Sequence, residues 1–196
     1  MVTGDGLLRD PLSRRRLLGM AGAGLGGASA AALAACGDDT RNPNVQTGPD
    51  ESDEADVEML NSVLDLELMA IEGYKSGAAA LRRPRLEIAK RFLEHERAHA
   101  EALATAIRDA DGRPNRPKSS YDLPRLRSER DVLRFGVDVA NTAIAAYIDA
   151  LPKLSQGRLR ALAASIVTVE AEHLVVLRAA LGEPPLGEAF VAGRAA

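Results

Sequence analysis

The stretch FLEHERAHAEAL, residues 92–103, places two ionisable side chains inside an apolar helical stripe. Phe92, Glu96, His99 and Leu103 follow one another at intervals of three and four residues, so they share one face of an α-helix. A carboxylate on the buried face of a helix is unfavourable unless another group pairs with it or a metal ion binds it. The pattern therefore indicates a helical bundle with a polar site in its interior.

Two metal chemistries fit the five letters HERAH at 95–99. As an H-E-x-x-H motif, His95 and His99 would bind zinc, and Glu96 would be the general base of a metalloprotease. As an E-x-x-H motif, Glu96 and His99 would be ligands of a two-metal carboxylate site inside a four-helix bundle. In that second interpretation His95 is a flanking residue or a hydrogen-bond partner of a ligand.

The second half of the domain repeats the first, and the repeat separates these alternatives. Glu96 and His99 match Glu170 and His173, whereas His95 matches Val169. The other matched pairs are Asp65 with Asp138, Ala70 with Ala143, Ile71 with Ile144, Tyr74 with Tyr147, Leu81 with Leu154, Leu103 with Leu177 and Ala106 with Ala180. Only E-x-x-H is repeated, so the zinc protease stays a minor alternative, and two similar helical hairpins are predicted.

Four amphipathic segments are predicted between residues 57 and 181. They start at Val57 with Asp56 as N-cap, and continue as Arg85–Asp111, Ser128–Leu151 and Gln156–Leu181. Their apolar stripes include Leu60, Leu64, Ile71 and Tyr74 in the first segment, and Ile88, Phe92, Leu103 and Ile107 in the second. Short, long and short connections predict an all-α four-helix bundle, and a composition with 3% aromatic residues and no Trp agrees.

The first 35 residues have the pattern of an export signal. Arg14 and Arg15 precede a mild Gly/Ala-rich apolar run, which resembles a Tat signal, and LAAC, ending at Cys36, resembles a lipobox. The expected product is anchored by a lipid on Cys36 to the outer face of the cytoplasmic membrane. The alternative is an uncleaved membrane anchor over residues 17–35, which the glycines make a poor spanning helix.

Residues 36–56 contain seven acidic residues and one arginine, and they read as an acidic flexible tether. Residues 182–196 read as a C-terminal tail that docks on the bundle. Cys36 is the only cysteine, so the chain forms no internal disulfide. No basic stripe with interleaved aromatic residues is present, so a nucleic-acid partner is not expected.

The whole pattern resembles the ferritin-like superfamily. The strings LDLELMAIEGY (64–74), NTAIAAYIDALPKL (141–154) and SIVTVEAEHLVVLRAALG (165–182) are similar to bacterial ferritin-like proteins of the desiccation-related type. The resemblance implies that Glu67 is a terminal ligand, Glu96 and Glu170 are bridging carboxylates, and His99 and His173 are nitrogen ligands. It further implies a di-iron or manganese site, with a ferroxidase or oxidative-stress role, and is compatible with a homodimer.

One position departs from that pattern. The third-helix equivalent of Glu67 is Ala140, where the family's di-metal pattern has a carboxylate. Asn141 is rotated by about a hundred degrees on a helix, and Asp138 falls on another face, so neither is an obvious substitute. An open coordination position, a single bound metal and a metal-free bundle all stay open, and the last would make the chain a helical envelope or stress scaffold. Tyr74 and Tyr147 either pack in the core, bond a carboxylate or support redox chemistry.

Overall fold

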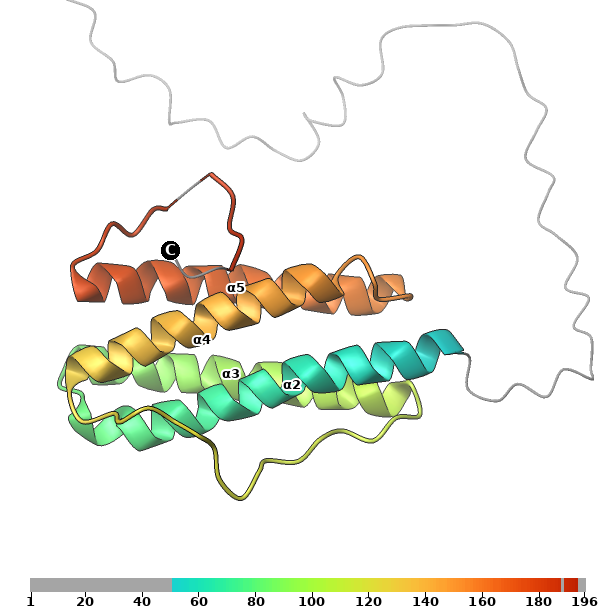
Figure 1. Cartoon of the computed structure of the whole chain (residues 1–196), viewed down its shortest axis with the longest axis horizontal. Coiled ribbons are helices and arrows are strands. Elements are labelled where there is room, and N and C mark those ends of the chain that lie inside the picture. Colours follow the sequence, from blue (N-terminus) through green and yellow to red (C-terminus); the bar gives the residue numbers. More distant parts are fainter. Residues whose placement is uncertain (1–50, 188, 194–196) are drawn as a thin grey trace, which may run out of the picture. The chain divides into compact units, whose positions relative to one another are not determined.

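The computed structural model describes residues 51–187 and 189–193, and all regular structure in this part of the chain is helical. The elements are α2 (Glu51–Gly77), the short 3-10 helix η1 (Ala78–Ala80), α3 (Arg85–Asp109), α4 (Glu129–Ala150) and α5 (Gly157–Leu181). Figure 1 shows two antiparallel hairpins, α2 with α3 and α4 with α5, packed into one bundle. The predicted all-α four-helix bundle is therefore confirmed.

The helix ends follow the local signals in the sequence. Ser128 caps α4 through a capping box, in which its hydroxyl accepts from the backbone N–H of Asp131 and the Asp131 carboxylate accepts from that of Ser128. Gly182 ends α5 in the left-handed conformation, at φ 76°, which glycine adopts without steric strain. The last three helices thus lie within two residues of their predicted bounds.

The start of the first helix differs from the prediction. α2 begins at Glu51, so Asp56 is not its N-cap but a buried residue inside it, and residues 51–56 of the predicted tether are helical. Asp56 instead accepts hydrogen bonds from the backbone N–H and the hydroxyl of Ser155, at 2.9 and 2.6 Å. The acidic residues that suggested a tether also favour the positive end of the helix dipole, which explains the longer helix.

Some predicted features lie outside the described residues. The signal segment with Arg14 and Arg15, the lipidation residue Cys36 and the remainder of the tether all fall there. Within the described residues, no helix combines the length and the apolarity that crossing a membrane requires.

A polar layer divides the buried core into two apolar clusters along the bundle axis. One cluster includes Tyr74, Phe92, Phe135, Ala140 and Leu177. The other includes Leu60, Leu64, Leu103, Ile107, Tyr147 and Ile166. Of the predicted stripe residues, only Ile71 and Ile88 are partly rather than fully buried. Because the buried Glu and His residues lie between these clusters in the sequences of α2, α3 and α5, they occupy the middle of the bundle.

Gly73 allows α2 to pack closely against α4. A Cβ atom added to Gly73 would clash with Cε1 and Cζ of the Phe135 ring, which lies against the α2 backbone at this point. The glycine therefore makes room for an aromatic side chain of the neighbouring hairpin. The approach of Phe135 to Gly73 is one of the contacts between the two hairpins.

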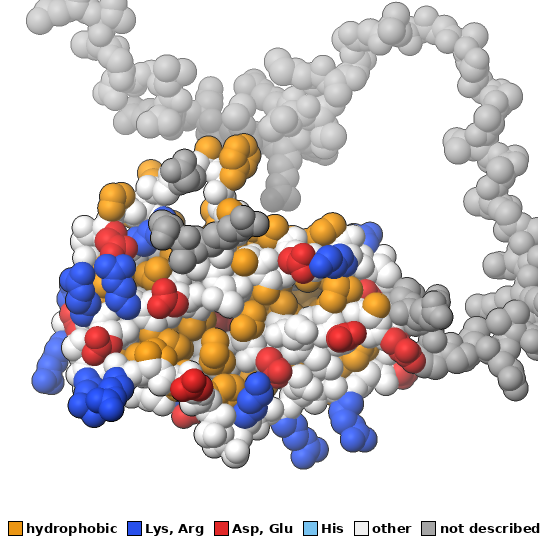
Figure 2. Space-filling model, viewed as in Figure 1, with side chains coloured by type: hydrophobic (Ala, Val, Ile, Leu, Met, Phe, Trp, Pro, Cys, Tyr) orange, Lys and Arg blue, Asp and Glu red, His pale blue; other side chains and the backbone are white. Residues whose placement is uncertain are grey.

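The long connection between α3 and α4 returns along the bundle, so that α4 starts at the same end as α3 (Figure 1). Asn115 fixes it to α2, because its backbone N–H donates to Asn61 and its side-chain amide to Asp65. The C-terminal tail folds back over α4 and α5, where a Cβ on Gly193 would clash with the backbone N of Ala145. Acidic and basic side chains are interspersed over the face shown in Figure 2.

Candidate metal centre

Three helices supply the five predicted ligands to the middle of the bundle. Glu67 comes from α2, Glu96 and His99 from α3, and Glu170 and His173 from α5. The three glutamates are each 1% exposed, and the histidines are 9% and 2% exposed. The E-x-x-H spacing places each Glu/His pair on one face of its helix, which is why both pairs turn inward together.

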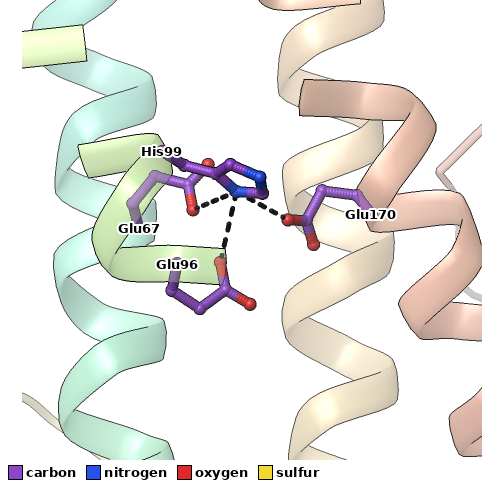
Figure 3. Close-up of side chains that lie close together, drawn as sticks. All are labelled: Glu67, Glu96, His99 and Glu170. Atoms are coloured by element: carbon purple, nitrogen blue, oxygen red, sulfur yellow. Dashed lines mark ion pairs between the residues drawn. The ribbon is translucent and has the colours of Figure 1, made fainter. Parts of the chain in front are cut away.

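His99 lies at the centre of three carboxylates (Figure 3). Its Nδ1 is 3.3 Å from Glu170 Oε1, 3.5 Å from Glu67 Oε2 and 3.7 Å from Glu96 Oε2. One donor atom from each of these four residues lies within 4.8 Å of the others. This spacing lets a single cation contact all four donors.

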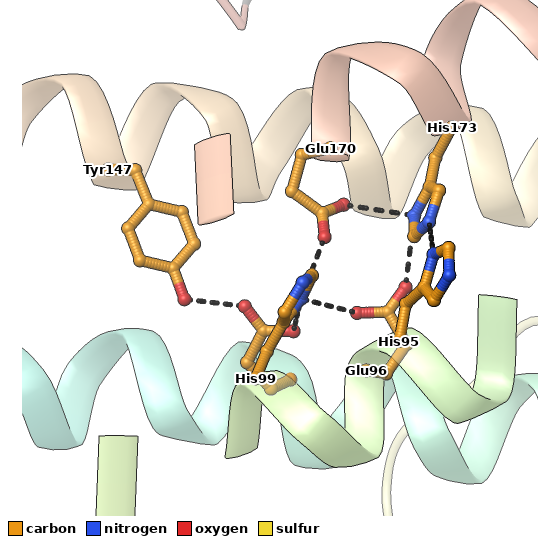
Figure 4. Close-up of polar contacts among 7 residues, drawn as sticks. His95, Glu96, His99, Tyr147, Glu170 and His173 are labelled. Atoms are coloured by element: carbon orange, nitrogen blue, oxygen red, sulfur yellow. Dashed lines mark hydrogen bonds and ion pairs between the residues drawn. The ribbon is translucent and has the colours of Figure 1, made fainter. Parts of the chain in front are cut away.

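His173 faces the other oxygens of two of the same carboxylates (Figure 4). Its Nδ1 is 3.4 Å from Glu96 Oε1 and 3.6 Å from Glu170 Oε2. Glu96 and Glu170 each therefore direct one oxygen toward His99 and the other toward His173. The two imidazoles are thus linked through two shared carboxylates.

Three further side chains contact this cluster from outside. The Tyr147 hydroxyl donates to Glu67 Oε1 at 2.5 Å, and His95 Nδ1 lies 2.9 Å from His173 Nε2, so that one of these ring nitrogens donates to the other. Phe92 packs against the His173 ring with centroids 4.0 Å apart. His95 thus contacts His173, while His99 lies among the carboxylates, which fits E-x-x-H better than a zinc pair of His95 and His99.

Helix α4, which the structure describes in full, adds no carboxylate or imidazole to this cluster. Ala140 is 2% exposed and offers only a methyl group. Asn141 is buried, but its side-chain amide donates to the Val137 carbonyl of its own helix at 3.0 Å, and Asp138 is exposed. The two tyrosines differ: Tyr147 bonds a carboxylate, whereas Tyr74 packs edge-on against Phe92 and Phe135.

The cluster is strongly coupled electrostatically. Burial opposes the charge on both histidines, but nearby carboxylates outweigh it, raising the pKa of His99 to about 11 and that of His173 to about 9. Burial is also the main cause that raises the pKa of Glu67 to about 8. At Glu96 burial is outweighed by the contacts with His173, His99 and Glu67, and the pKa falls to about 2. Imidazolium and carboxylate groups thus compensate one another near neutral pH.

The donor set fits a metal ion of the iron or manganese type. Glu96 Oε1, Glu170 Oε1, His99 Nδ1 and His173 Nδ1 are buried and have no hydrogen-bond partner. Buried polar atoms without partners are rare and unfavourable. Among the described residues the only other such side-chain atom is Arg85 Nε, so four of the five lie in this cluster. Carboxylate oxygens combined with imidazole nitrogens are donors that suit these ions.

Solved structures with a similar fold include two bacterial proteins. A conserved hypothetical protein from Mycobacterium tuberculosis superposes with a TM-score of 0.64 at 21% sequence identity, covering 71% of this chain and 99% of the other. A structure described as ferritin-like, diiron-carboxylate proteins from Bacillus anthracis superposes with a TM-score of 0.59 at 20% identity, covering 67% and 99%. At these identities the likeness concerns the fold alone.

No curated protein matches the chain. The family model described as "Ferritin-like domain" matches residues 55–183. This range contains α3, α4 and α5 completely and all of α2 except its first four residues. That match covers more than half of the 196 residues. The chain therefore belongs to the ferritin-like domain family.

Proposed function

We propose that this protein binds iron or manganese in the bundle core and supports oxidation of Fe(II) or the handling of reactive oxygen species. The observation that carries the proposal is the way Glu96 and Glu170 each span His99 and His173. The Bacillus anthracis structure with the same fold is described as diiron-carboxylate, which supports the assignment by analogy.

Each residue has a distinct role in this proposal. His99 and His173 would each give one nitrogen to a metal ion, Glu96 and Glu170 would bridge, and Glu67 would be a terminal ligand. A bound iron or manganese ion supplies one-electron redox chemistry. The chain positions the ligands on rigid helices and excludes bulk water, because the apolar clusters enclose the ligand layer on both sides.

We also propose that the protein is exported and anchored to the outer face of the cytoplasmic membrane by a lipid on Cys36. This part rests on the twin arginines Arg14 and Arg15, the mild apolar run and the LAAC sequence. A role in desiccation or oxidative stress rests on the sequence strings that resemble that branch of the family.

A metal-free scaffold is the second candidate, and two observations favour it. Ala140 removes one carboxylate from the expected set. In addition, the raised pKa values of His99 and His173 allow imidazolium groups to balance the carboxylates without a metal ion. In that case the chain would keep the fold as an exported helical scaffold.

Metal content per chain separates these candidates. The full chain is loaded anaerobically with Fe(II) or Mn(II), desalted and analysed beside the Glu96→Gln/Glu170→Gln variant. The matched control is Glu101→Gln/Glu172→Gln, which removes two exposed carboxylates from the same helices. Retention of one or about two ions by the wild type and control, with loss in the buried double variant, supports the metal site. Equal and negligible metal in all three proteins would overturn it and leave the scaffold.

A further inference from the structure

We infer that the two metal positions are unequal: the position at His99 fills first and holds its ion, and the position at His173 exchanges its ion with solvent. This inference rests on the proposed metal site. The two halves of the cluster share the Glu/His repeat but differ at two other positions, and the inference follows from these differences.

The His99 position has a complete donor set from three helices. Three carboxylate oxygens surround His99 Nδ1 at 3.3 to 3.7 Å. The terminal carboxylate is also fixed in place, because Glu67 accepts a hydrogen bond from Tyr147 on α4. An ion here gains four protein donors whose positions are set before it binds, so little ordering opposes its binding.

The His173 position lacks the corresponding terminal carboxylate. Within residues 51–187 and 189–193, the carboxylates within ion-pair distance of His173 are Glu96 and Glu170, which it shares with the other position. The residue that matches Glu67 in the repeat is Ala140, which is buried and has no donor atom. An ion here therefore has fewer protein donors and less neutralising charge, and its remaining coordination is open to an exchangeable ligand.

His95 is a positioning residue for this second position. Its Nδ1 contacts His173 Nε2 at 2.9 Å, which leaves His173 Nδ1 directed at the carboxylates. A group that accepts from the outer nitrogen of a ligating histidine fixes the ring and its tautomer. The match of His95 in the other half is Val169, so His99 has no such partner from the repeat. His95 is only partly buried, so its side chain borders both solvent and the second position.

Anaerobic Mn(II) titration of the full chain tests this order of filling. Electron paramagnetic resonance measures free Mn(II) at each step, and a spin-coupled signal at the end reports two neighbouring ions. The wild type is expected to bind in two phases with dissociation constants at least about tenfold apart. Glu67→Gln should weaken the first phase by about tenfold or more. Ala140→Glu should tighten the second phase or bring it into range, and Ala140→Gln, of equal size without charge, should not.

The His95 variants test the positioning role separately. His95→Phe should weaken only the second phase, by about 10- to 100-fold. His95→Asn keeps a side-chain acceptor, and it should restore part of that loss. Circular dichroism of the helices and the thermal midpoint identify any variant that fails to fold. Glu67→Gln and His95→Asn resemble the native side chains in shape, so they are the variants expected to fold.

The outcomes separate the inference from the proposed function. Binding in two phases would support the inference. A single bound ion would also support it, if Glu67→Gln loses that ion and Ala140→Glu binds a second one. Two equivalent ions, or a first phase that His95→Phe weakens and Glu67→Gln leaves unchanged, would overturn the inference alone. No Mn(II) or Fe(II) bound by wild type and Ala140→Glu would overturn the proposed function itself.

Discussion

The hydroxyl of Tyr147 on α4 donates a 2.5 Å hydrogen bond to Glu67 Oε1 on α2, across 80 residues of sequence. The other oxygen of Glu67 lies 3.5 Å from His99 Nδ1. Helix α4, which supplies no carboxylate at Ala140, thus contributes to the candidate centre by orienting a candidate ligand of the opposite hairpin. The two hairpins are joined in the ligand layer itself.

Removal of this hydroxyl should affect both stability and metal binding. Tyr147→Phe leaves a buried acceptor without its donor, so the free energy of unfolding of the metal-free chain should fall by about 1–3 kcal/mol. The affinity of the tighter metal position should fall by roughly tenfold. Urea denaturation and Mn(II) titration measure the two effects. The control Tyr121→Phe, in the α3–α4 connection, should stay within about 0.5 kcal/mol of wild type, and an equal loss in both variants would contradict the role of Tyr147.

The metal-free chain should lose stability as the pH rises from about 7 to 10. The pKa values of His173 and His99 rise from 6.5 to about 9 and about 11, and that of Glu67 rises from 4.5 to about 8. The folded chain therefore keeps protons that the unfolded chain has released, and folding weakens as the pH passes those raised values. The lowered pKa of Glu96 acts oppositely, since its contribution is lost only as the pH falls toward about 2.

Urea midpoints between pH 6 and pH 10, measured with a chelator present, check this dependence. Glu67→Gln should flatten the part of the curve that lies between its two pKa values. A stability that is constant or rises over the alkaline range would mean that the histidines are not held as cations by the carboxylates.

Gly73 should not tolerate a side chain. Gly73→Ala gains about 0.5–1 kcal/mol of helix propensity, but the added methyl group meets the Phe135 ring, and overpacking typically costs about 1–3 kcal/mol. A net decrease in the free energy of unfolding is expected. Gly157→Ala is the matched control, because the nearest atom to its added Cβ is Arg160 Nη2 at 3.8 Å. If Gly73→Ala were as stable as Gly157→Ala, the Phe135 ring could not lie directly against the α2 backbone at Gly73.

Asp56 should stabilise the fold through its contact with Ser155, and not as the N-cap that was predicted. Asp56→Ala removes the acceptor for both the backbone N–H and the hydroxyl of Ser155, and should lower the free energy of unfolding by about 1.5–3 kcal/mol. Asp122→Ala, in an exposed part of the long connection, should change it by less than about 0.5 kcal/mol. Equal, small effects of the two substitutions would show that the buried contact contributes nothing.

Membrane attachment should depend on one side chain. In cells, Cys36→Ser is expected to shift the protein from the membrane fraction to the soluble extracytoplasmic fraction, because a lipid on Cys36 is the proposed anchor. Arg14→Lys/Arg15→Lys should instead retain the precursor in the cytoplasm. Membrane association that persists in Cys36→Ser would favour the alternative of an uncleaved anchor over residues 17–35.

The apolar periodicity of the sequence predicted most of the fold. Apolar residues at intervals of three and four predicted four helices of nearly the observed length. The exception was the start of α2, where acidic residues suit both a solvated tether and the first turns of a helix. Local composition alone does not separate these two states, because the helical state also gains the contacts of Asp56 with Ser155 in the α4–α5 connection.

The sequence by itself determined which residues face the interior and at which position, compared with the family's pattern, a carboxylate is missing. The duplicated E-x-x-H placed four side chains on inner faces, and the match of Glu67 to Ala140 showed the gap. The partners of these side chains were decided only by the tertiary structure. The contact of His95 with His173 spans 78 residues and that of Tyr147 with Glu67 spans 80. Helical periodicity fixes the direction of a side chain around its own axis, but the rotation, tilt and axial offset of packed helices fix the atoms it meets.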